Sequence, residues 1–383
     1  MALRGLLKSP TTSSYTSKIC GFRMHGTKAV ASVAEEQVSA MRRSERQKFL
    51  GHVAVRMKSM LMWTGTTLDS VLSQQITCSP PKVVEKETSN KVALAGLIEG
   101  MKAYRGEDGR VLMFRPELNA MRMKNGAERM CMHSPSVQQF MEGVKQTVLA
   151  NKRWVPPPGK GSLYLRPLLF GSGASLGVSA ASEYTFVVFG SPVQNYFKEG
   201  TAALNLYVEE VVPRAYIGGT GAVKAISNYG PVLDAMRRAK ARGFSDVLYL
   251  DAETKKNIEE VSAANIFLVK FLESFQGNTI VTPATNGTIL RGIIRESVIE
   301  IALDLGYKVE ERVVPVEELK EAEEVFCTGT AAGIASVGSI TFQNIRTEYK
   351  VGDGLVTQQL RSILVGIQNG SIQDTKGWVL EID

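Results

Sequence analysis

Apolar residues recur at helical spacing in four stretches of the chain. In the second stretch they fall at Phe140, Val144 and Val148, and in the fourth at Ile294 and Val298, so each set lines one face of a helix. The pattern predicts helices over residues 118–131, 135–150, 229–242 and 293–305.

Shorter apolar runs bounded by turn-forming residues predict strands. Their expected ranges are 162–169, 184–190, 203–211, 246–250, 265–269, 280–282 and 324–328. In the second half of the chain these strands alternate with helices, which is typical of an α/β fold. The run FGSGASLGVSAAS at 170–182 has the composition of a connector. We therefore expect a smaller domain over 35–175 and a larger domain over 176–383.

Composition adds a few exclusions. The 383 residues are 44% hydrophobic, which is enough to bury the cores of two domains. The four cysteines include no C-x-x-C pair and the three histidines lack metal-ligand spacing, so we expect no metal site. No apolar run reaches the roughly 18 residues that a membrane span needs, and we expect no membrane association.

The net charge of +7 could suggest a nucleic-acid partner, but its distribution argues against one. Residues 1–34 hold five basic residues and no acidic residue, so this segment carries five of the seven net charges and the rest of the chain only two. A basic leader rich in Ser, Thr and small residues is typical of an organelle transit peptide. We predict a mitochondrial presequence, with a plastid transit peptide or a solvated tail as alternatives.

Candidate chemistry lies in four segments, which are GGTGAVKAISNYGP (218–231), NIEEVSAANIF (257–267), GTILRGIIRES (287–297) and VFCTGTAAGIASVG (325–338). The amine of Lys224 could hold pyridoxal phosphate as a Schiff base. The carboxylate of Glu260 could face the pyridine nitrogen. The helix start after Gly292 and the hydroxyl of Thr330 could hold the phosphate. In this order the segments predict a pyridoxal phosphate site.

Each feature is weak when taken alone. A lone lysine in a loop is usually a solvated charge, and a glutamate at the end of a strand usually lies on the surface. A nucleotide-binding phosphate loop needs Lys directly after Gly and a hydroxyl next. Here Ala222 and Val223 precede Lys224 and Ala225 follows it, so that motif is not matched.

The ordered set resembles the fold-type IV aminotransferases, and most closely the plant branched-chain amino acid aminotransferases. Similar to that family are the four segments above, the upstream stretches 97–123 and 161–178, and the closing stretch 351–379. The resemblance implies a smaller N-terminal α/β domain and a larger pseudo-barrel domain, with pyridoxal phosphate at the domain interface of a homodimer.

The resemblance also implies roles for individual residues. Lys224 would carry the cofactor, Glu260 would face its pyridine nitrogen and Tyr229 would face its ring hydroxyl. The implied phosphate ligands are Arg115, Ile293, Ile294 and Thr330. The implied substrate-binding residues are Tyr164, Arg166, Ala331 and Ala332. Many relatives have Thr where this chain has Ile294, a change that matters little if the backbone N–H is the ligand.

Residues 41–96 depart from the family pattern. Reading Val55–Val92 from synonymous codons shifted by one base gives a stretch similar to the missing family segment. We therefore predict a shifted reading frame there, together with the absence of about twenty further family residues before Leu97. Strands of the smaller domain should then be lost and sheet edges left uncovered.

Two functions follow from the resemblance. The first is reversible amino transfer between leucine, isoleucine or valine and 2-oxoglutarate. The alternative is a catalytically impaired relative that binds pyridoxal phosphate, because of the altered N-terminal segment. D-amino acid transaminases and aminodeoxychorismate lyases share the fold and are rivals for the substrate only. A binding protein that reuses the fold is a further interpretation, which the retention of the site residues disfavours.

Overall fold

The computed structural model describes residues 61–65, 96–172, 179–194, 203–272 and 277–382, which all belong to one compact unit. The leader expected at 1–34 lies outside the described residues, as does most of the divergent segment 41–96. None of the helices in the described residues is long and apolar enough to span a membrane.

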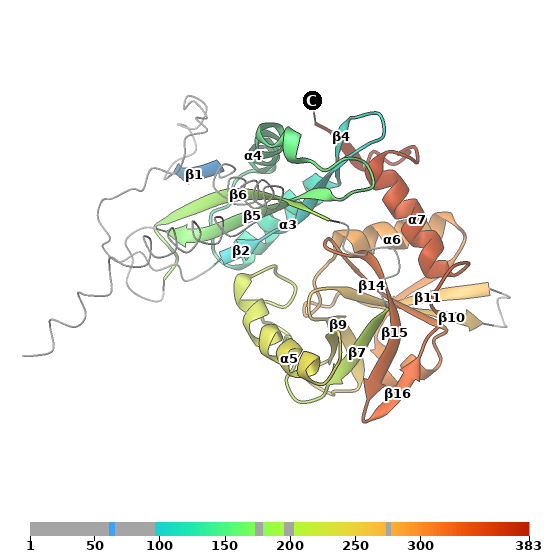
Figure 1. The fold of residues 1–383 in the computed structure, drawn as a ribbon. Helices are drawn as coiled ribbons and strands as arrows, with labels where there is room; N and C mark the ends of the chain where they lie inside the picture. The colour runs from blue at the N-terminus through green and yellow to red at the C-terminus, as the bar shows by residue number, and fades with distance from the viewer. Residues whose placement is uncertain (1–60, 66–95, 173–178, 195–202, 273–276, 383) are drawn as a thin grey trace, which may run out of the picture. The chain divides into compact units, whose positions relative to one another are not determined.

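In the described part of the chain, seven strands form a first sheet in the order β1-β6-β5-β3-β4-β17, with β2 paired to β5 (Figure 1). The bounds are β1 Leu61–Gly65, β2 Gly96–Ile98, β3 Met101–Arg105, β4 Val111–Phe114, β5 Ser162–Ser172, β6 Glu183–Val193 and β17 Val379–Glu381. Strand β17 comes from the C-terminal end of the chain and pairs antiparallel with β4. The first sheet therefore contains strands from both the N-terminal and the C-terminal ends of the described chain.

The connector expected at 170–182 does not separate two domains. Strands β5 and β6 flank it and pair antiparallel from Ser162↔Val193 to Ser172↔Glu183. The first sheet therefore continues to Val193, and the second sheet begins at Leu204. This finding corrects the boundary expected at 175, because a Gly/Ser/Ala run serves a hairpin as well as a linker.

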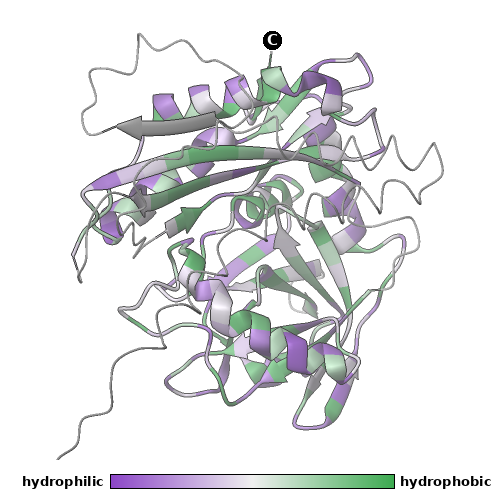
Figure 2. Cartoon of the chain, turned by 60° about the vertical axis from the view of Figure 1, so that its left-hand side comes forward, coloured by the Kyte–Doolittle hydropathy of each residue, from purple (hydrophilic) through white to green (hydrophobic). Residues whose placement is uncertain are grey.

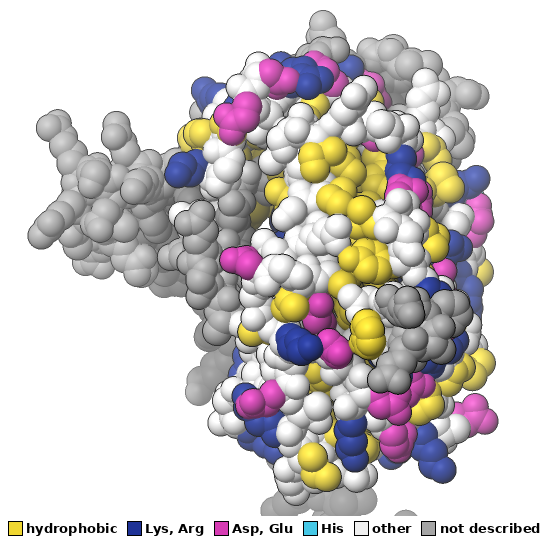
Figure 3. All heavy atoms as spheres, turned by 90° about the vertical axis from the view of Figure 1, so that its right-hand side faces the viewer, with side chains coloured by type: hydrophobic (Ala, Val, Ile, Leu, Met, Phe, Trp, Pro, Cys, Tyr) yellow, Lys and Arg dark blue, Asp and Glu magenta, His cyan; other side chains and the backbone are white. Residues whose placement is uncertain are grey.

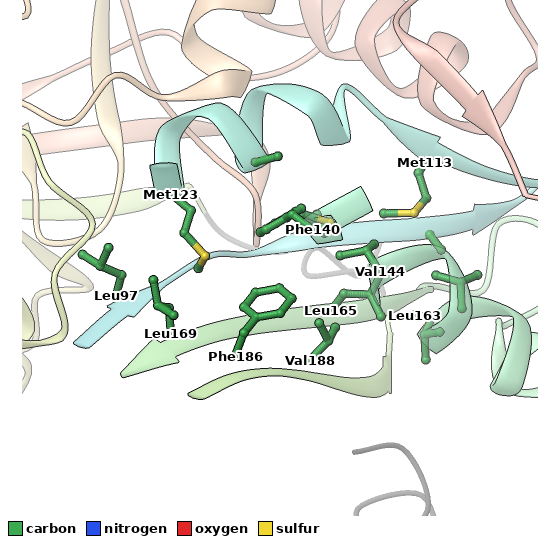
Figure 4. Close-up of a cluster of buried hydrophobic side chains, with 14 of the residues drawn as sticks. Leu97, Met113, Met123, Phe140, Val144, Leu163, Leu165, Leu169, Phe186 and Val188 are labelled. Carbon is green, nitrogen blue, oxygen red and sulfur yellow. The ribbon is translucent and has the colours of Figure 1, made fainter. Parts of the chain in front are cut away.

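The helices α3 (Pro116–Arg129) and α4 (Val137–Ala150) pack on the first sheet. Figure 4 shows Phe140 and Val144 of α4 beside Phe186 of β6, among the apolar side chains of this core. Helix α4 begins with a capping box, in which Gln139 N donates to Ser136 Oγ and Ser136 N donates to Gln139 Oε1. Burial of each large apolar side chain contributes about 1.5–3 kcal/mol to this packing.

Ten strands of the described residues form the second sheet, in the order β12-β11-β10-β14-β15-β7-β8-β9-β13, with β16 paired to β15. The bounds are β7 Leu204–Glu209, β8 Asp246–Leu250, β9 Asn257–Val261, β10 Asn265–Leu272, β11 Gly277–Pro283, β12 Lys308–Arg312, β13 Val314–Pro315, β14 Glu324–Gly329, β15 Gly333–Phe342 and β16 Ile345–Glu348. One apolar cluster includes residues of β11, β9 and β13, so distant strands of this order enclose a common core. The sheet is therefore curved, as a pseudo-barrel requires.

Side chains of β10 alternate between two cores. Ile266 and Leu268 belong to the cluster enclosed by the sheet, whereas Phe267 and Val269 belong to the cluster on its other face. This alternation follows from the period of two along a strand, and both faces are apolar because both are covered. The covering helices are α6 (Ile293–Asp304) and α7 (Val356–Asn369), whose apolar residues lie in the second of these clusters.

Helix α5 (Tyr229–Ala241) packs on β8 through Val232 and Ala235. Short 3₁₀ helices occupy Lys152–Trp154, Ile226–Asn228 and Val316–Lys320. Figure 2 shows that the helices carry both hydrophilic and hydrophobic residues, as the helical spacing in the sequence predicts. The four predicted helices and the seven predicted strands are confirmed, with shifts of a few residues at their ends.

The divergent segment contributes a strand, contrary to expectation. Strand β1 pairs antiparallel with β6, from Leu61↔Val188 to Gly65↔Tyr184. The edge that β6 would otherwise present is thus paired over five residues. The prediction that this segment lacks strands is wrong for residues 61–65.

On the face of the molecule shown in Figure 3, basic and acidic side chains of the described residues are interspersed. Opposite charges of the large domain also form ion pairs, such as Lys350 with Glu323 at 2.6 Å and Lys376 with Asp304 at 2.7 Å. Charge of both signs is therefore mixed on this face and does not form a single-sign patch.

Candidate active site

Lys224 lies where a loop of the larger domain meets the first sheet. Ile98 N donates to Lys224 O at 3.0 Å, and Leu97 forms an antiparallel bridge with Ala225. Leu97 is also buried in the core of the first sheet (Figure 4). The backbone on both sides of Lys224 is thus anchored to a packed core. Lys224 Nζ donates to Tyr229 Oη at 3.3 Å, so the predicted amine and phenol are in contact.

The amide of Asn228 holds the loop that carries Lys224. Asn228 Nδ2 donates to Thr220 O at 2.7 Å and to Val223 O at 2.8 Å, and its Oδ1 accepts from Thr220 Oγ1 at 2.8 Å. Gly221 is needed in this loop because a Cβ there would lie 2.3 Å from Thr288 O. The loop is therefore fixed on one side by an amide and on the other by close backbone packing.

Glu260 points into the same cluster from β9 and is 2% exposed. Its Oε1 accepts from Arg214 Nη1 at 2.6 Å and from Leu290 N at 3.0 Å. Burial raises the pKa of Glu260 to about 7, while the charges of Arg214 and Lys224 act in the opposite direction. The structure therefore brings together Lys224, Tyr229 and Glu260.

The turn before α6 is pinned by three side chains from different elements. Glu260 accepts from Leu290 N, and Asn265 Nδ2 donates to Leu290 O at 2.9 Å. Arg122 Nη1 donates to Arg291 O at 2.8 Å. Gly292 is required at the end of the turn because a Cβ there would lie 2.1 Å from Asn265 Oδ1. The turn thus has one defined shape at the helix start.

Helix α6 begins at Ile293 without a side-chain cap on its first N–H groups. The first turn of a helix presents unpaired N–H groups and a partial positive charge, which suit an anion such as phosphate. Ile293 and Ile294 themselves are buried, and Ile294 packs into the apolar cluster between the sheet and α7. The side chain of Ile294 therefore serves packing, and its backbone N–H is the group available to a ligand.

Arg122 and Glu99 form a buried ion pair beside this turn. Arg122 Nε donates to Glu99 Oε1 at 2.8 Å and Nη2 donates to Oε2 at 2.7 Å, while Asn119 Nδ2 donates to Oε2 at 2.7 Å. Burial disfavours the charged form of Glu99, but Arg122, Lys224 and Asn119 outweigh it and lower the pKa of this carboxyl. Glu99 is 0% exposed, and its lowered pKa favours the anionic form within the site.

The predicted substrate-side residues lie next to this pair. Arg166 Nη1 donates to Glu99 O at 3.1 Å and Nη2 donates to Tyr164 Oη at 2.9 Å. From the second sheet, Thr330 Oγ1 donates to Gly100 O at 3.2 Å. Lys102 Nζ donates to Ala331 O at 2.8 Å, which joins β3 to the turn containing Ala331 and Ala332. Burial lowers the pKa of Lys102 to about 8.

Arg115 is engaged outside this cluster. Its Nη1 donates to Ser297 Oγ at 2.9 Å and to Glu300 Oε1 at 2.8 Å, beyond the first turn of α6, and its guanidinium lies 4.5 Å from the ring centroid of Trp378. Arg115 also adopts a left-handed backbone conformation just before Pro116 starts α3. This placement argues against the phosphate role expected for Arg115, because its guanidinium stabilises the packing of α6 instead.

The sequence interpretation missed Arg122, Glu99 and Arg214. The sequence did contain a signal for Arg122. Asn119 and Arg122 are spaced i, i+3 among the apolar residues of α3 and so share its buried face. Glu99 interrupts an apolar stretch between two strands, and a charge in such a place is rarely buried without a partner. Arg214 had no comparable signal, since only the folding of β9 brings Glu260 to it.

The comparisons with known proteins agree with this geometry. Residues 96–340 match the family model of the class IV amino-transferases. The chain is 75% identical, over 100% of both chains, to the Arabidopsis thaliana protein named branched-chain-amino-acid aminotransferase 1, mitochondrial. It is 62% identical over 75% of its length, and 72% of the relative, to a mitochondrial branched-chain amino acid aminotransferase of Humulus lupulus. An Arabidopsis methionine aminotransferase is 50% identical over 75% of this chain and 79% of the relative.

Solved structures give the same result for the fold. A branched-chain aminotransferase from Thermoproteus uzoniensis, solved with norvaline, has a TM-score of 0.65 and 27% identity, covering 76% of this chain and 90% of that one. The branched-chain amino acid aminotransferase from Thermobaculum terrenum, solved in its pyridoxal phosphate form, has a TM-score of 0.64 and 25% identity, covering 75% of this chain and 89% of that one.

The folded core and the cluster around Lys224 thus define a pyridoxal-phosphate-dependent aminotransferase of the two-domain fold-type IV class. The chain belongs to the class IV aminotransferases and, within them, to the branched-chain amino acid aminotransferases of plants.

The comparisons give no support to the alternative of an impaired relative. The full-length match spans 390 positions against 383 residues, which leaves far fewer unmatched positions than the roughly twenty missing residues that we expected. The shifted reading frame itself stays a prediction.

Proposed function

We propose that this chain transfers the amino group of leucine, isoleucine or valine to 2-oxoglutarate, and catalyses the reverse transfer, with pyridoxal phosphate held at the cluster around Lys224. The observation that carries this proposal is the convergence on Lys224 of one phenol, Tyr229, and two buried carboxylates, Glu99 and Glu260, from three separate segments of the chain. Together with the uncapped start of α6, these groups fit the cofactor, which needs an amine, a carboxylate and an anion site.

Lys224 would bind the cofactor through its amine and move a proton at the substrate Cα. A lysine suits both tasks because its amine is a nucleophile and a base once it loses its proton. Tyr229 would orient this amine across the 3.3 Å contact. When bound, the cofactor supplies an electron sink for the negative charge that develops at Cα.

Glu260 would hold a proton on the pyridine nitrogen. A carboxylate can do this only while it is anionic, and burial opposes that state by raising the pKa of Glu260 to about 7. The contact with Arg214 at 2.6 Å supports the anionic state. A positive ring nitrogen beside Glu260 would also favour the anionic state of this carboxyl group.

Three kinds of donor would bind the phosphate. They are the guanidinium of Arg122, the first N–H groups of α6 at Ile293 and Ile294, and the hydroxyl of Thr330. Arg122 takes the place that the sequence interpretation gave to Arg115, because its Nη1 reaches the turn before α6. Charge-assisted donors at a helix start are a strong combination for an anion.

Tyr164, Arg166 and Lys102 would form the end of the site that binds substrate carboxylate groups, with the backbone at Ala331 and Ala332. Two cations on the adjacent strands β3 and β5 would suit the second carboxylate of 2-oxoglutarate, which leucine, isoleucine and valine lack. The same place must then accept an apolar side chain in the other half of the reaction. Lys102 and Arg166 are both tied to backbone carbonyls, so their charges have fixed positions.

The test is transamination by the purified, cofactor-loaded enzyme. Each of leucine, isoleucine and valine is paired with 2-oxoglutarate, and glutamate formation is measured against methionine and D-alanine under the same conditions. We expect kcat/KM to be highest for the three branched-chain substrates. Higher kcat/KM for methionine would assign this chain the activity named for its 50% identical relative, and preference for D-alanine would contradict the proposal.

The proposal includes a mitochondrial location and a homodimer. The basic leader of residues 1–34 and the mitochondrial names of two relatives support the first. A fusion of residues 1–34 to a fluorescent protein should enter mitochondria and exclude plastids. For the homodimer, light scattering after size-exclusion chromatography should give twice the mass of one chain. The mass of a single chain would contradict a homodimer.

A further inference from the structure

Glu99 is the one fully buried carboxylate that contacts both ends of the site in the described residues. Its two oxygens receive Nε and Nη2 of Arg122 at 2.8 and 2.7 Å, a two-point contact that fixes the plane of the guanidinium. With those donors engaged, Nη1 is directed at Arg291 O in the turn before α6. Asn119 and the N–H of Gly100 bind Glu99 Oε2 and hold the carboxylate itself in place.

The backbone of Glu99 contacts Arg166, at the end of the site that would bind the substrate. Its carbonyl accepts from Arg166 Nη1 at 3.1 Å, and its N–H donates to Pro167 O at 2.8 Å. Arg166 in turn donates to Tyr164 Oη. The adjacent Gly100 allows this arrangement, because a Cβ there would lie 2.3 Å from Tyr164 Oη. One residue thus connects the guanidinium near the phosphate turn with the guanidinium near the substrate.

We propose that Glu99 is a positioning residue that sets the orientation of Arg122 for the phosphate of the cofactor and, through its backbone, the place of Arg166 for the substrate. The inference rests on the proposed function and deepens it. Glu99 has no need to touch substrate or cofactor. It acts through the two arginines.

Electrostatics supports positioning over attraction. A carboxylate beside a phosphate site weakens the attraction for an anion, so Glu99 would be unfavourable if charge alone mattered. Yet Arg122, Arg166, Lys102 and Lys224 crowd one region, and Glu99 offsets their repulsion before any ligand binds. A buried carboxylate with a lowered pKa keeps its charge over the working pH range, so the orientation of Arg122 does not change with pH.

The experiment measures ligand binding to the apoenzyme, independent of turnover. We compare Glu99→Gln, Glu99→Asp, Arg122→Met and the double variant by fluorescence titration with pyridoxal phosphate and by the shift in melting temperature with inorganic phosphate. We expect Glu99→Gln to weaken cofactor affinity about 10- to 100-fold, since it replaces a charge-assisted hydrogen bond to Arg122 with a neutral one. Glu99→Asp keeps the charge and should recover part of the affinity. In the double variant, the Glu99 change should add little to Arg122→Met.

Glu324→Gln is the matched control. Glu324 is another buried carboxylate, at the opposite end of β14 from the turn that contains Thr330, and it binds the backbone N–H groups at the start of α7. It should lower the melting temperature with unchanged cofactor affinity. If Glu99→Gln behaves like this control, or if its effect adds fully to that of Arg122→Met, the positioning role is wrong.

Steady-state kinetics separates this inference from the proposed function. With saturating cofactor, Glu99→Gln should raise KM for 2-oxoglutarate at least as strongly as it lowers kcat, because losing the charge weakens the side-chain contacts, including that from Gly100 N, which hold the Glu99 carbonyl against Arg166. A fall in kcat alone would contradict the inference. If the wild-type enzyme transaminates none of the substrates, the proposed function fails, whereas the cofactor and phosphate titrations still decide the role of Glu99.

Discussion

Two buried carboxylate–arginine pairs flank Lys224, and their carboxyl groups have opposite shifts in pKa. Glu99, at the first sheet, receives two N–H groups of Arg122, the amide of Asn119 and a backbone N–H, and its pKa is lowered. Glu260, in the second sheet, receives one N–H of Arg214 and one backbone N–H on a single oxygen, and its pKa is raised to about 7.

The difference teaches that burial alone does not set the charge of a carboxyl group. Both groups are almost inaccessible, so each bears a large desolvation cost. The hydrogen-bond donors and the neighbouring charges together decide which effect wins. Four donors make Glu99 a fixed anion, which suits a structural charge. Glu260 has two donors and a pKa of about 7, so a further positive group nearby would favour its anionic form. This property suits a partner of the pyridine nitrogen.

The largest effect should come from removing the amine between the two pairs. Lys224→Met should lower kcat by roughly 10⁴-fold, because no other described amine lies against Tyr229. Borohydride reduction of the wild-type enzyme followed by peptide mapping should place the pyridoxyl group on Lys224. Lys240→Met, at an exposed position of α5, serves as the control and should keep full activity. A pyridoxyl group found on Lys240 or Lys270 would overturn the assignment.

The next effect separates the two pairs by their chemistry. Glu260→Gln should keep the cofactor bound but slow the proton step at Cα by roughly 10²- to 10³-fold, because an amide cannot hold the ring nitrogen protonated. A rapid half-reaction with valine deuterated at Cα measures this step. Glu324→Gln is the matched control, since Glu324 is also buried but binds backbone N–H groups at the start of α7 instead. A half-reaction near the wild-type rate in Glu260→Gln would remove its proposed role.

Arg214→Met should convert the second pair to a single buried carboxyl group. Without Arg214 the pKa of Glu260 should rise further, so the acidic limb of the kcat/KM profile should move to higher pH. Measured pH–rate profiles of the variant and the wild type test this shift. Arg238→Met, which removes a partly exposed pair with Glu209, should leave the profile in place. An unshifted profile for Arg214→Met would mean that this arginine does not act on Glu260.

The two pairs should also give the apoenzyme opposite responses to pH. The raised pKa of Glu260 means that the folded state binds an extra proton between about pH 4.5 and pH 7, so its contribution to stability is lost as pH rises through that range. The lowered pKa of Glu99 means that its contribution is present above about pH 4.5 and is lost as pH falls.

Urea unfolding of the apoenzyme from about pH 2 to pH 8 measures these contributions. For Glu260, the shift from 4.5 to about 7 corresponds to a contribution on the order of 3 kcal/mol. Glu260→Gln should flatten the fall in stability between about pH 4.5 and pH 7, and Glu99→Gln should flatten the loss at lower pH. Parallel curves for a variant and the wild type would show that the carboxyl group in question is not shifted as described.

The smallest effect tests the correction made for Arg115. Because Arg115 binds Ser297 and Glu300 and stacks on Trp378, Arg115→Gln should lower the free energy of unfolding by about 1 kcal/mol and leave cofactor affinity unchanged. Arg122→Gln should weaken cofactor affinity instead. Cofactor titration of both variants decides between the two arginines, and a weaker affinity in Arg115→Gln alone would restore the first assignment.

The sequence by itself determined the elements and the chemistry close to Lys224. Helical spacing at Phe140, Val144 and Val148 predicted α4, and α6 was predicted in the same way, because these patterns are local. The contact of Lys224 with Tyr229 was also predictable, since both residues lie in one short segment. Glu260 was predictable as a member of an ordered motif, although its partner was not.

Only the tertiary structure decided which arginine reaches the turn before α6. Arg115 directly precedes α3 and Arg122 lies within it. The sequence favoured Arg115 as the phosphate ligand, whereas folding directs Arg115 to Ser297 and Glu300 of α6 and directs Arg122 to Glu99 and the turn before α6. The pair of Arg214 with Glu260 joins residues 46 positions apart, and the hairpin of β5 and β6 replaces the expected linker. Such pairings depend on how strands and helices pack, and no local periodicity encodes them.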